Sequence, residues 1–224
     1  MRTEARVIDL SKTEYGTFAA PDTNRVIRNT YQLLALSTAV AGVGAGISML
    51  AGFGPLAGIV FTLLGLVPLF YLNKNRNTAA AVPTMLTFTA LSGLGLGPTL
   101  SHYINLPGGS STVLTAAVIT TAVTLALTGY VHKTGKDFSR MGGFLFAGLI
   151  VVILASIAAM FVPAMQAGVS AVAALLFSGF ILFDTSRLVR GEETNYVMAA
   201  VSMYLNVLNL FLSVLQLLGF SSND

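Results

Sequence analysis

One acidic residue stands where its chemistry could matter in an otherwise apolar stretch. Asp184 follows the apolar run 171–183, which only Ser178 and Gly179 interrupt. A carboxylate at the edge of lipid depth is a candidate proton-sensitive gate or cation ligand if it faces the interior of a helix bundle. The competing interpretation is an interfacial ion pair with Arg187, which lies three residues further on the same helix face.

A row of amide and hydroxyl side chains occupies one face of the last apolar run. Its members recur every three or four residues, which is the spacing of a single helical stripe. Buried amides need partners, so the stripe should face other helices or water. It is either a polar lining opposite Asp184 or a set of interhelical hydrogen bonds, and both interpretations place this helix near the centre. The stripe consists of Asn206, Asn209, Ser213 and Gln216.

The residue sets typical of membrane enzymes are missing from the sequence. The chain has no Cys, which excludes disulfides and thiolate metal sites. His102 and His132 are expected in loops on opposite sides of a membrane, so they cannot share a metal or serve a membrane serine protease. A single carboxylate at helix depth cannot form the pair that an aspartyl protease needs. We therefore expect no enzymatic activity and no cofactor.

Seven apolar runs must position these residues. Of the 224 residues, 54% are hydrophobic and 9% are charged, whereas a soluble domain carries roughly 25% charged residues. A helix needs about 20 apolar residues to cross the hydrocarbon core of a bilayer. We predict an all-α integral membrane domain over residues 29–224, with seven transmembrane helices over the runs Tyr31–Leu50, Pro55–Leu72, Ala79–Leu100, Val113–Val131, Gly143–Val162, Ala167–Phe183 and Val197–Leu218.

The basic residues fall on one side of the membrane if these runs are helices. Short loops rich in Lys and Arg stay cytoplasmic, so the N-terminus should be cytoplasmic and the C-terminus periplasmic. The net charge of +3 follows these loops and indicates weak attraction to anionic lipid, not a nucleic-acid surface. The basic residues are Arg2, Arg6, Lys12, Arg25, Arg28, Lys74, Arg76, Lys133, Lys136, Arg140, Arg187 and Arg190.

The first 28 residues form a separate segment. They hold nine of the 21 charged residues and contain no apolar core of the signal-peptide type. We expect Met1 to Arg28 to be a flexible cytoplasmic tail.

Glycines inside the runs predict where helix backbones approach closely. Small residues four apart allow such contacts in a membrane. Gly42 and Gly46 form one small-xxx-small pair, and the flanking Ala41 and Ala45 form another. Around Gly93–Pro98 the alternative is a hinge or a broken helix, because Pro removes a backbone donor. The other glycines expected at helix contacts are Gly58, Gly65, Gly93, Gly95 and Gly97.

The C-terminal part of the chain resembles the Bax inhibitor-1 family, also called transmembrane BAX inhibitor motif proteins. The resemblance rests on Phe183-Asp184-Thr185-Ser186-Arg187, on Gly191-Glu192-Glu193-Thr194-Asn195-Tyr196, and on the stretch from Ala200 to Phe211. The entry sequence Arg25 to Tyr31 and the seven runs fit the same family, so the resemblance covers essentially the whole chain. It is strongest to the bacterial branch that includes the modulator of the FtsH membrane protease.

This resemblance implies six helices around a central seventh and two candidate functions. One is a pH-sensitive calcium leak, in which an Asp on the sixth helix pairs with an Asp on the seventh. Asp184 matches the first position and is a possible calcium contact, but Asn206 stands at the second. The basic residue of the family's second helix has no match within Pro55–Leu72. The ion-path candidates for such a leak are Asp184, Asn206, Asn209 and Arg187.

The other function that the resemblance implies is binding to a membrane-anchored AAA protease, which slows degradation of other membrane proteins. A AAA machine needs an unstructured cytoplasmic segment to grip, and the tail from Met1 to Arg28 is charged and polar. The alternative role for the tail is a plain determinant of topology. We predict an inner-membrane modulator of an FtsH-type protease, with the calcium or cation leak gated at Asp184 as the alternative.

Overall fold

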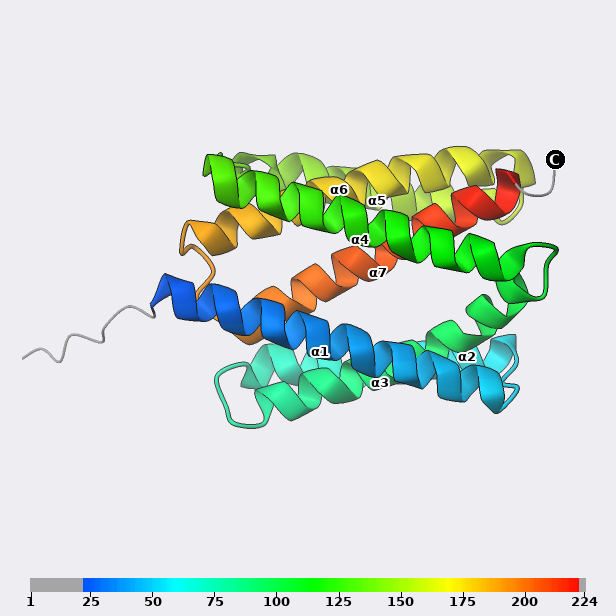
Figure 1. Cartoon of the computed structure of the whole chain (residues 1–224), viewed down its shortest axis with the longest axis horizontal. Helices are drawn as coiled ribbons and strands as arrows, with labels where there is room; N and C mark the ends of the chain where they lie inside the picture. The colour runs from blue at the N-terminus through cyan, green and yellow to red at the C-terminus, as the bar shows by residue number, and fades with distance from the viewer. Residues whose placement is uncertain (1–21, 222–224) are drawn as a thin grey trace, which may run out of the picture.

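The computed structural model describes residues 22–221, and this part of the chain is all-helical with no strand (Figure 1). The seven predicted runs each form one long helix. Two short 3-10 turns, η2 (Ser139–Met141) and η3 (Pro163–Met165), precede the fifth and sixth helices. The long helices are α1 (Thr23–Leu50), α2 (Pro55–Asn75), α3 (Ala81–Ile104), α4 (Gly109–Thr134), α5 (Gly142–Ala159), α6 (Gln166–Val189) and α7 (Tyr196–Ser221).

Apolar length identifies most of these helices as membrane spans. Six of them are long and apolar enough to cross a bilayer. The remaining helix, α3, has 24 residues, and at 1.5 Å per residue it is about 36 Å long, enough to cross a hydrocarbon core of about 30 Å. It packs closely against both α1 and α2.

The helices form two layers with α7 between them. The first layer holds α1, α2 and α3, the second holds α4, α5 and α6, and α7 crosses diagonally between the two (Figure 1). In α7, 56% of the 18-residue apolar stretch is buried, whereas at most 33% of the corresponding stretch is buried in the other five of these six helices. Its closest neighbours are α6, α4, α1 and α3, whereas α2 packs mainly on α3 and α5 mainly on α6. The seventh helix is thus central, as expected. The other six do not form a closed ring around it, because α2 and α5 do not pack closely on α7.

The close contact between α1 and α3 uses other glycines than the expected pair. A Cβ atom at Gly42 or Gly46 would meet nothing within 4 Å, so the prediction that these two pack against a helix was wrong. Gly44 instead faces the backbone of α3, and Gly93 lies against the backbone of Ala41. Because α3 runs unbroken through Gly93 and Pro98, the broken-helix alternative was wrong as well.

The start of α1 lies earlier than the apolar run suggested. The Asp22 carboxylate accepts a hydrogen bond of 3.1 Å from the backbone N–H of Asn24, and such a cap stabilises the first turn of a helix. Residues 23–28 of the predicted tail are therefore helical. The rest of the predicted tail, residues 1–21, lies outside the described residues.

One end of the molecule, which we call the basic end, carries the α2–α3, α4–α5 and α6–α7 loops and the start of α1 (Figure 1, left). Helices of similar length that alternate in direction bring these segments together. All the described Lys and Arg residues belong to this end: Arg25, Arg28, Lys74, Arg76, Lys133, Lys136, Arg140, Arg187 and Arg190.

Candidate functional site

Asp184 joins α6 to α7 through hydrogen bonds to Ser202 and Asn206, a contact that we call the clasp. The Oδ2 atom of Asp184 accepts a hydrogen bond of 2.5 Å from the Ser202 hydroxyl and one of 2.7 Å from the Asn206 amide. Ser202 and Asn206 are four residues apart, so they lie one above the other on the face of α7 that meets α6. Only 7% of the Asn206 side chain is exposed. The carboxylate thus satisfies the buried amide of Asn206 and the partly buried hydroxyl of Ser202 with one group.

Arg187 is not the ion-pair partner of Asp184. Its guanidinium lies 3.8 Å from the Glu193 carboxylate and 5.5 Å from the centre of the Phe183 ring. The α6–α7 turn brings Glu193 back over α6, because the backbone N–H groups of Glu192 and Glu193 both donate to the Arg187 carbonyl, at 2.9 and 3.3 Å. The interfacial Asp184–Arg187 pair considered from the sequence is therefore replaced by an Arg187–Glu193 pair.

The amide stripe of α7 lines a cavity of about 630 Å³ between α5, α6 and α7. The Asn209 amide donates to the Leu205 carbonyl at 2.8 Å, and the Ser213 hydroxyl donates to the Asn209 carbonyl at 2.7 Å. Gln216 accepts a hydrogen bond of 2.6 Å from Ser170 on α6. The stripe thus makes an interhelical hydrogen bond and also forms a polar wall, so the two interpretations drawn from the sequence are not exclusive.

A cation would find few charged ligands in this part of the protein. Within residues 22–221, no group of three or more His, Cys, Asp or Glu side chains could hold a metal ion. Calcium prefers six to eight oxygen ligands with several carboxylates among them. The arrangement around Asp184 supplies one carboxylate, an amide and a hydroxyl, and its hydrogen bonds join α6 to α7.

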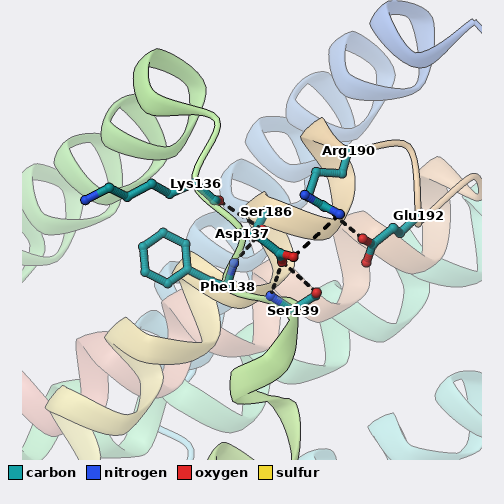
Figure 2. Close-up of polar contacts among 7 residues, drawn as sticks. All are labelled: Lys136, Asp137, Phe138, Ser139, Ser186, Arg190 and Glu192. Carbon is teal, nitrogen blue, oxygen red and sulfur yellow. Dashed lines mark hydrogen bonds and ion pairs between the residues drawn. The ribbon is translucent and has the colours of Figure 1, made fainter.

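A second polar cluster joins the α4–α5 loop to the end of α6 (Figure 2). The buried Ser186 hydroxyl accepts a hydrogen bond of 2.9 Å from the backbone N–H of Phe138 and donates one of 3.3 Å to the Lys136 carbonyl. Arg190 lies 3.5 Å from Asp137 and 2.9 Å from Glu192. The cluster thus ties the loop to α6 within one turn of Asp184.

This cluster was missed in the sequence, although one local signal pointed to part of it. Asp137 and Ser139 have the spacing of an Asx turn, and Oδ1 of Asp137 accepts hydrogen bonds from the Ser139 backbone N–H and hydroxyl at 2.8 and 2.6 Å. The partner of Ser186 lies 48 residues away, and no local pattern reveals such a contact.

The loop contact should weaken in acid. Hydrogen bonds from the Ser139 side chain and backbone, aided by Arg190 and Arg140, hold the pKa of the Asp137 carboxyl below its usual value. A group with a lowered pKa in the folded state stabilises that state above its unfolded pKa of about 3.9, and this contribution is lost as the pH falls through the folded pKa. We therefore expect faster hydrogen exchange at the Ser139 amide, corrected for the intrinsic rate, as the pH is lowered from 6 to 3.

The Asp137→Asn variant is the control for this prediction. It should show faster corrected exchange at the Ser139 amide already at pH 6 and little further change in acid. Equal pH dependence in the variant and the wild type would contradict a role for the Asp137 carboxylate.

Asn195 makes the corresponding connection to the α2–α3 loop. Its side-chain amide donates to the Arg76 carbonyl at 2.9 Å and to the Asn77 side chain at 2.8 Å. Its oxygen accepts hydrogen bonds from the backbone N–H groups of Val197 and Met198, which caps the start of α7. The α6–α7 loop is consequently joined to both other loops of the basic end.

Comparison with known proteins agrees with this architecture. The family model described as Inhibitor of apoptosis-promoting Bax1 matches residues 23–223. A protein described as an uncharacterized membrane protein of Vibrio cholerae is 44% identical over 206 residues, which cover 91% of this chain and 92% of that protein. The Modulator of FtsH protease YccA of Escherichia coli is 39% identical over 206 residues, covering 90% of this chain and 93% of that protein.

A second Escherichia coli sequence with the same identity and coverage is described as Inner membrane protein YccA. The match to the family model spans all seven helices, including the Asp184–Asn206 clasp and the three loops of the basic end. The chain therefore belongs to the Bax inhibitor-1 family, as a multi-pass protein of the inner membrane.

Proposed function

We propose that this protein binds and modulates an FtsH-type membrane AAA protease in the quality control of membrane proteins. The observation that carries the proposal is the 39% identity, over 90% of the chain, to a protein named for modulation of the FtsH protease. The family model spans residues 23–223, which include all seven helices and the loops between them. A regulatory role is consistent with a site in which Asp184 accepts two hydrogen bonds and joins α6 to α7.

Topology supports this proposal. Seven spans, together with the gathering of Lys and Arg in the loops of the basic end, support an orientation with that end on the cytoplasmic side. In this orientation residues 1–21, which precede α1, are expected in the cytoplasm, where a AAA domain could engage them. The C-terminus would face the periplasm.

The calcium leak is not part of this proposal. The second carboxylate that the resemblance requires is an amide here, at Asn206, and this amide is already bonded to Asp184. Calcium flux into proteoliposomes that contain this protein tests the leak directly. A flux that depends on Asp184 would support it.

Removal of residues 2–21 tests the tail as the segment that the protease engages. We expect the truncated protein to be degraded several-fold more slowly and to lose its effect on the turnover of a second membrane substrate. Arg25 and Arg28 remain in the truncated chain, so its orientation should be kept. The measurement is pulse–chase turnover in cells, together with co-purification of the protease.

A full-length variant with residues 2–21 in shuffled order is the matched control, because it keeps the length and charge of the tail. If the intact protein neither co-purifies with the protease nor alters turnover of the second substrate, the proposed function is wrong. If the intact and truncated proteins act equally, the protease engages another part of the molecule.

A further inference from the structure

Threonines on the inner face of α4 carry hydroxyl groups that no protein group satisfies. The hydroxyls of Thr120, Thr124 and Thr128 are buried and have no hydrogen-bond partner within the described part of the chain. Their spacing of four residues puts them in one row along α4. Thr120 is only 3% exposed, so bulk water does not reach this part of the row.

Other threonines in the protein avoid this situation. A threonine in a helix can turn its hydroxyl back to the carbonyl four residues earlier. Thr134 on the same helix does so with the Tyr130 carbonyl at 2.8 Å, and Thr30 does so with the Val26 carbonyl at 2.8 Å. The hydroxyls of the α4 row make no such bond.

At the end of the row nearest the basic end, hydroxyls from three helices meet. The Tyr31 hydroxyl of α1 lies beside those of Thr185 on α6 and Thr128 on α4, close enough for a hydrogen-bonding interaction with each. None of the three makes a well-formed hydrogen bond to another protein group among residues 22–221, and all three oxygen atoms are buried. Thr185 is fully buried. Tyr31 belongs to the first helix layer, whereas Thr128 and Thr185 belong to the second.

His132 closes this junction toward the basic end. Its ring centre lies 5.7 Å from that of Tyr31, and its Nδ1 atom lies 2.9 Å from the Thr128 carbonyl oxygen. The backbones of α1 and α4 do not pack closely against each other, so side chains span the space between them. The junction is therefore polar and lies between α1 and α4, whose backbones do not pack closely.

We propose that Tyr31, Thr128 and Thr185 bind an ordered water molecule, and that Thr124 and Thr120 extend this hydrated contact inward along α4. A buried water typically makes about three hydrogen bonds to groups that would otherwise be unsatisfied. Three hydroxyls from three helices supply that number. The water links the two helix layers at the residue that follows Asp184, and this role does not depend on the proposed protease partner.

Water-edited solid-state NMR of the threonine-labelled protein in lipid bilayers tests the site. We expect rapid magnetisation transfer from water to Thr124, Thr128 and Thr185. Thr89 is the control, because it is also fully buried but donates its hydroxyl to the Leu86 carbonyl at 3.1 Å; it should receive no such transfer. Equally slow transfer to Thr128, Thr185 and Thr89 would overturn the proposal.

Isosteric variants provide an independent measurement. If water is bound, Tyr31→Phe and Thr185→Val each remove one of its partners and should lower the Tm by about 2–4 °C. The double variant should lose less than the sum of the two, because both side chains hold the same water. If the junction is dry, each substitution removes an unsatisfied hydroxyl and the Tm rises, which would refute the water site.

Discussion

Gly93→Ala is expected to prevent stable folding, although it adds a single methyl group. A Cβ atom at this position would run into the backbone of Ala41 on α1, at the carbonyl carbon and oxygen and at Cα. Backbone atoms cannot rotate out of the way as a flexible side chain can, so α1 and α3 would have to separate. We expect a loss of at least about 3 kcal/mol in the free energy of unfolding, at the upper end of overpacking costs.

Helix propensity alone would make Gly93→Ala stabilising, so a large loss of stability would have to come from the steric clash with α1. Alanine is better than glycine in a helix by roughly 0.5–1 kcal/mol. Gly42→Ala is the matched control, because its Cβ would meet nothing within 4 Å and only the propensity gain remains. Thermal unfolding in detergent, followed by circular dichroism, should show a collapse for Gly93→Ala and no loss for Gly42→Ala. Similar Tm values for the two variants would contradict the close α1–α3 contact.

Apolar periodicity was sufficient to predict the helices. Seven runs separated by short polar turns have one solution in a bilayer, because every backbone group must be satisfied within its own helix. The polar stripe of α7 also predicted that this helix is central, since amides such as Asn206 cannot face lipid without cost. Both conclusions depend on properties of single helices, namely apolar length and the spacing of polar residues, and these can be obtained from short stretches of sequence.

Contacts between helices could not be predicted in the same way. Glycines 42, 44 and 46 all lie in α1, and the sequence does not say which of them meets α3. Spacing favoured Arg187 as the partner of Asp184, whereas Asn206 was suggested by the polar stripe and by the family resemblance. The outcome depends on the rotation of α6 against α7 and on a turn that recruits Glu193 to Arg187.

The unpaired threonines of α4 were not identified from the sequence. A spacing of four residues, as at Thr120, Thr124 and Thr128, does not by itself indicate a site, because most helical threonines satisfy their hydroxyls locally. Only the approach of Tyr31 and Thr185 from other helices shows that one end of this row belongs to a junction.

Asn206→Asp is expected to make the stability of this protein strongly dependent on pH. The substitution places a second carboxylate 2.7 Å from the Asp184 oxygen, where the Asn206 amide now donates its hydrogen bond. Two buried carboxylates at this distance repel each other unless one holds a proton. At neutral pH we expect a loss of about 3 kcal/mol, as for other buried charges left without compensation. Lowering the pH supplies the missing proton, so the Tm of this variant should rise toward that of the wild type.

The reciprocal exchange separates this effect from simple disruption. In the Asp184→Asn/Asn206→Asp double variant, one carboxylate and one amide still face each other, so the hydrogen bond can form in the opposite direction. Its Tm should recover most of the loss and should vary with pH much less than that of Asn206→Asp. Failure to recover would show that the polarity of the clasp is fixed by Ser202, which donates to Asp184 from one turn earlier on α7. Equal stability of Asn206→Asp and the wild type at every pH would mean that the two side chains do not meet. Calcium flux can be measured on the same variants. A flux that appears only with Asn206→Asp would show that the amide of Asn206 is what keeps a cation path closed in this protein.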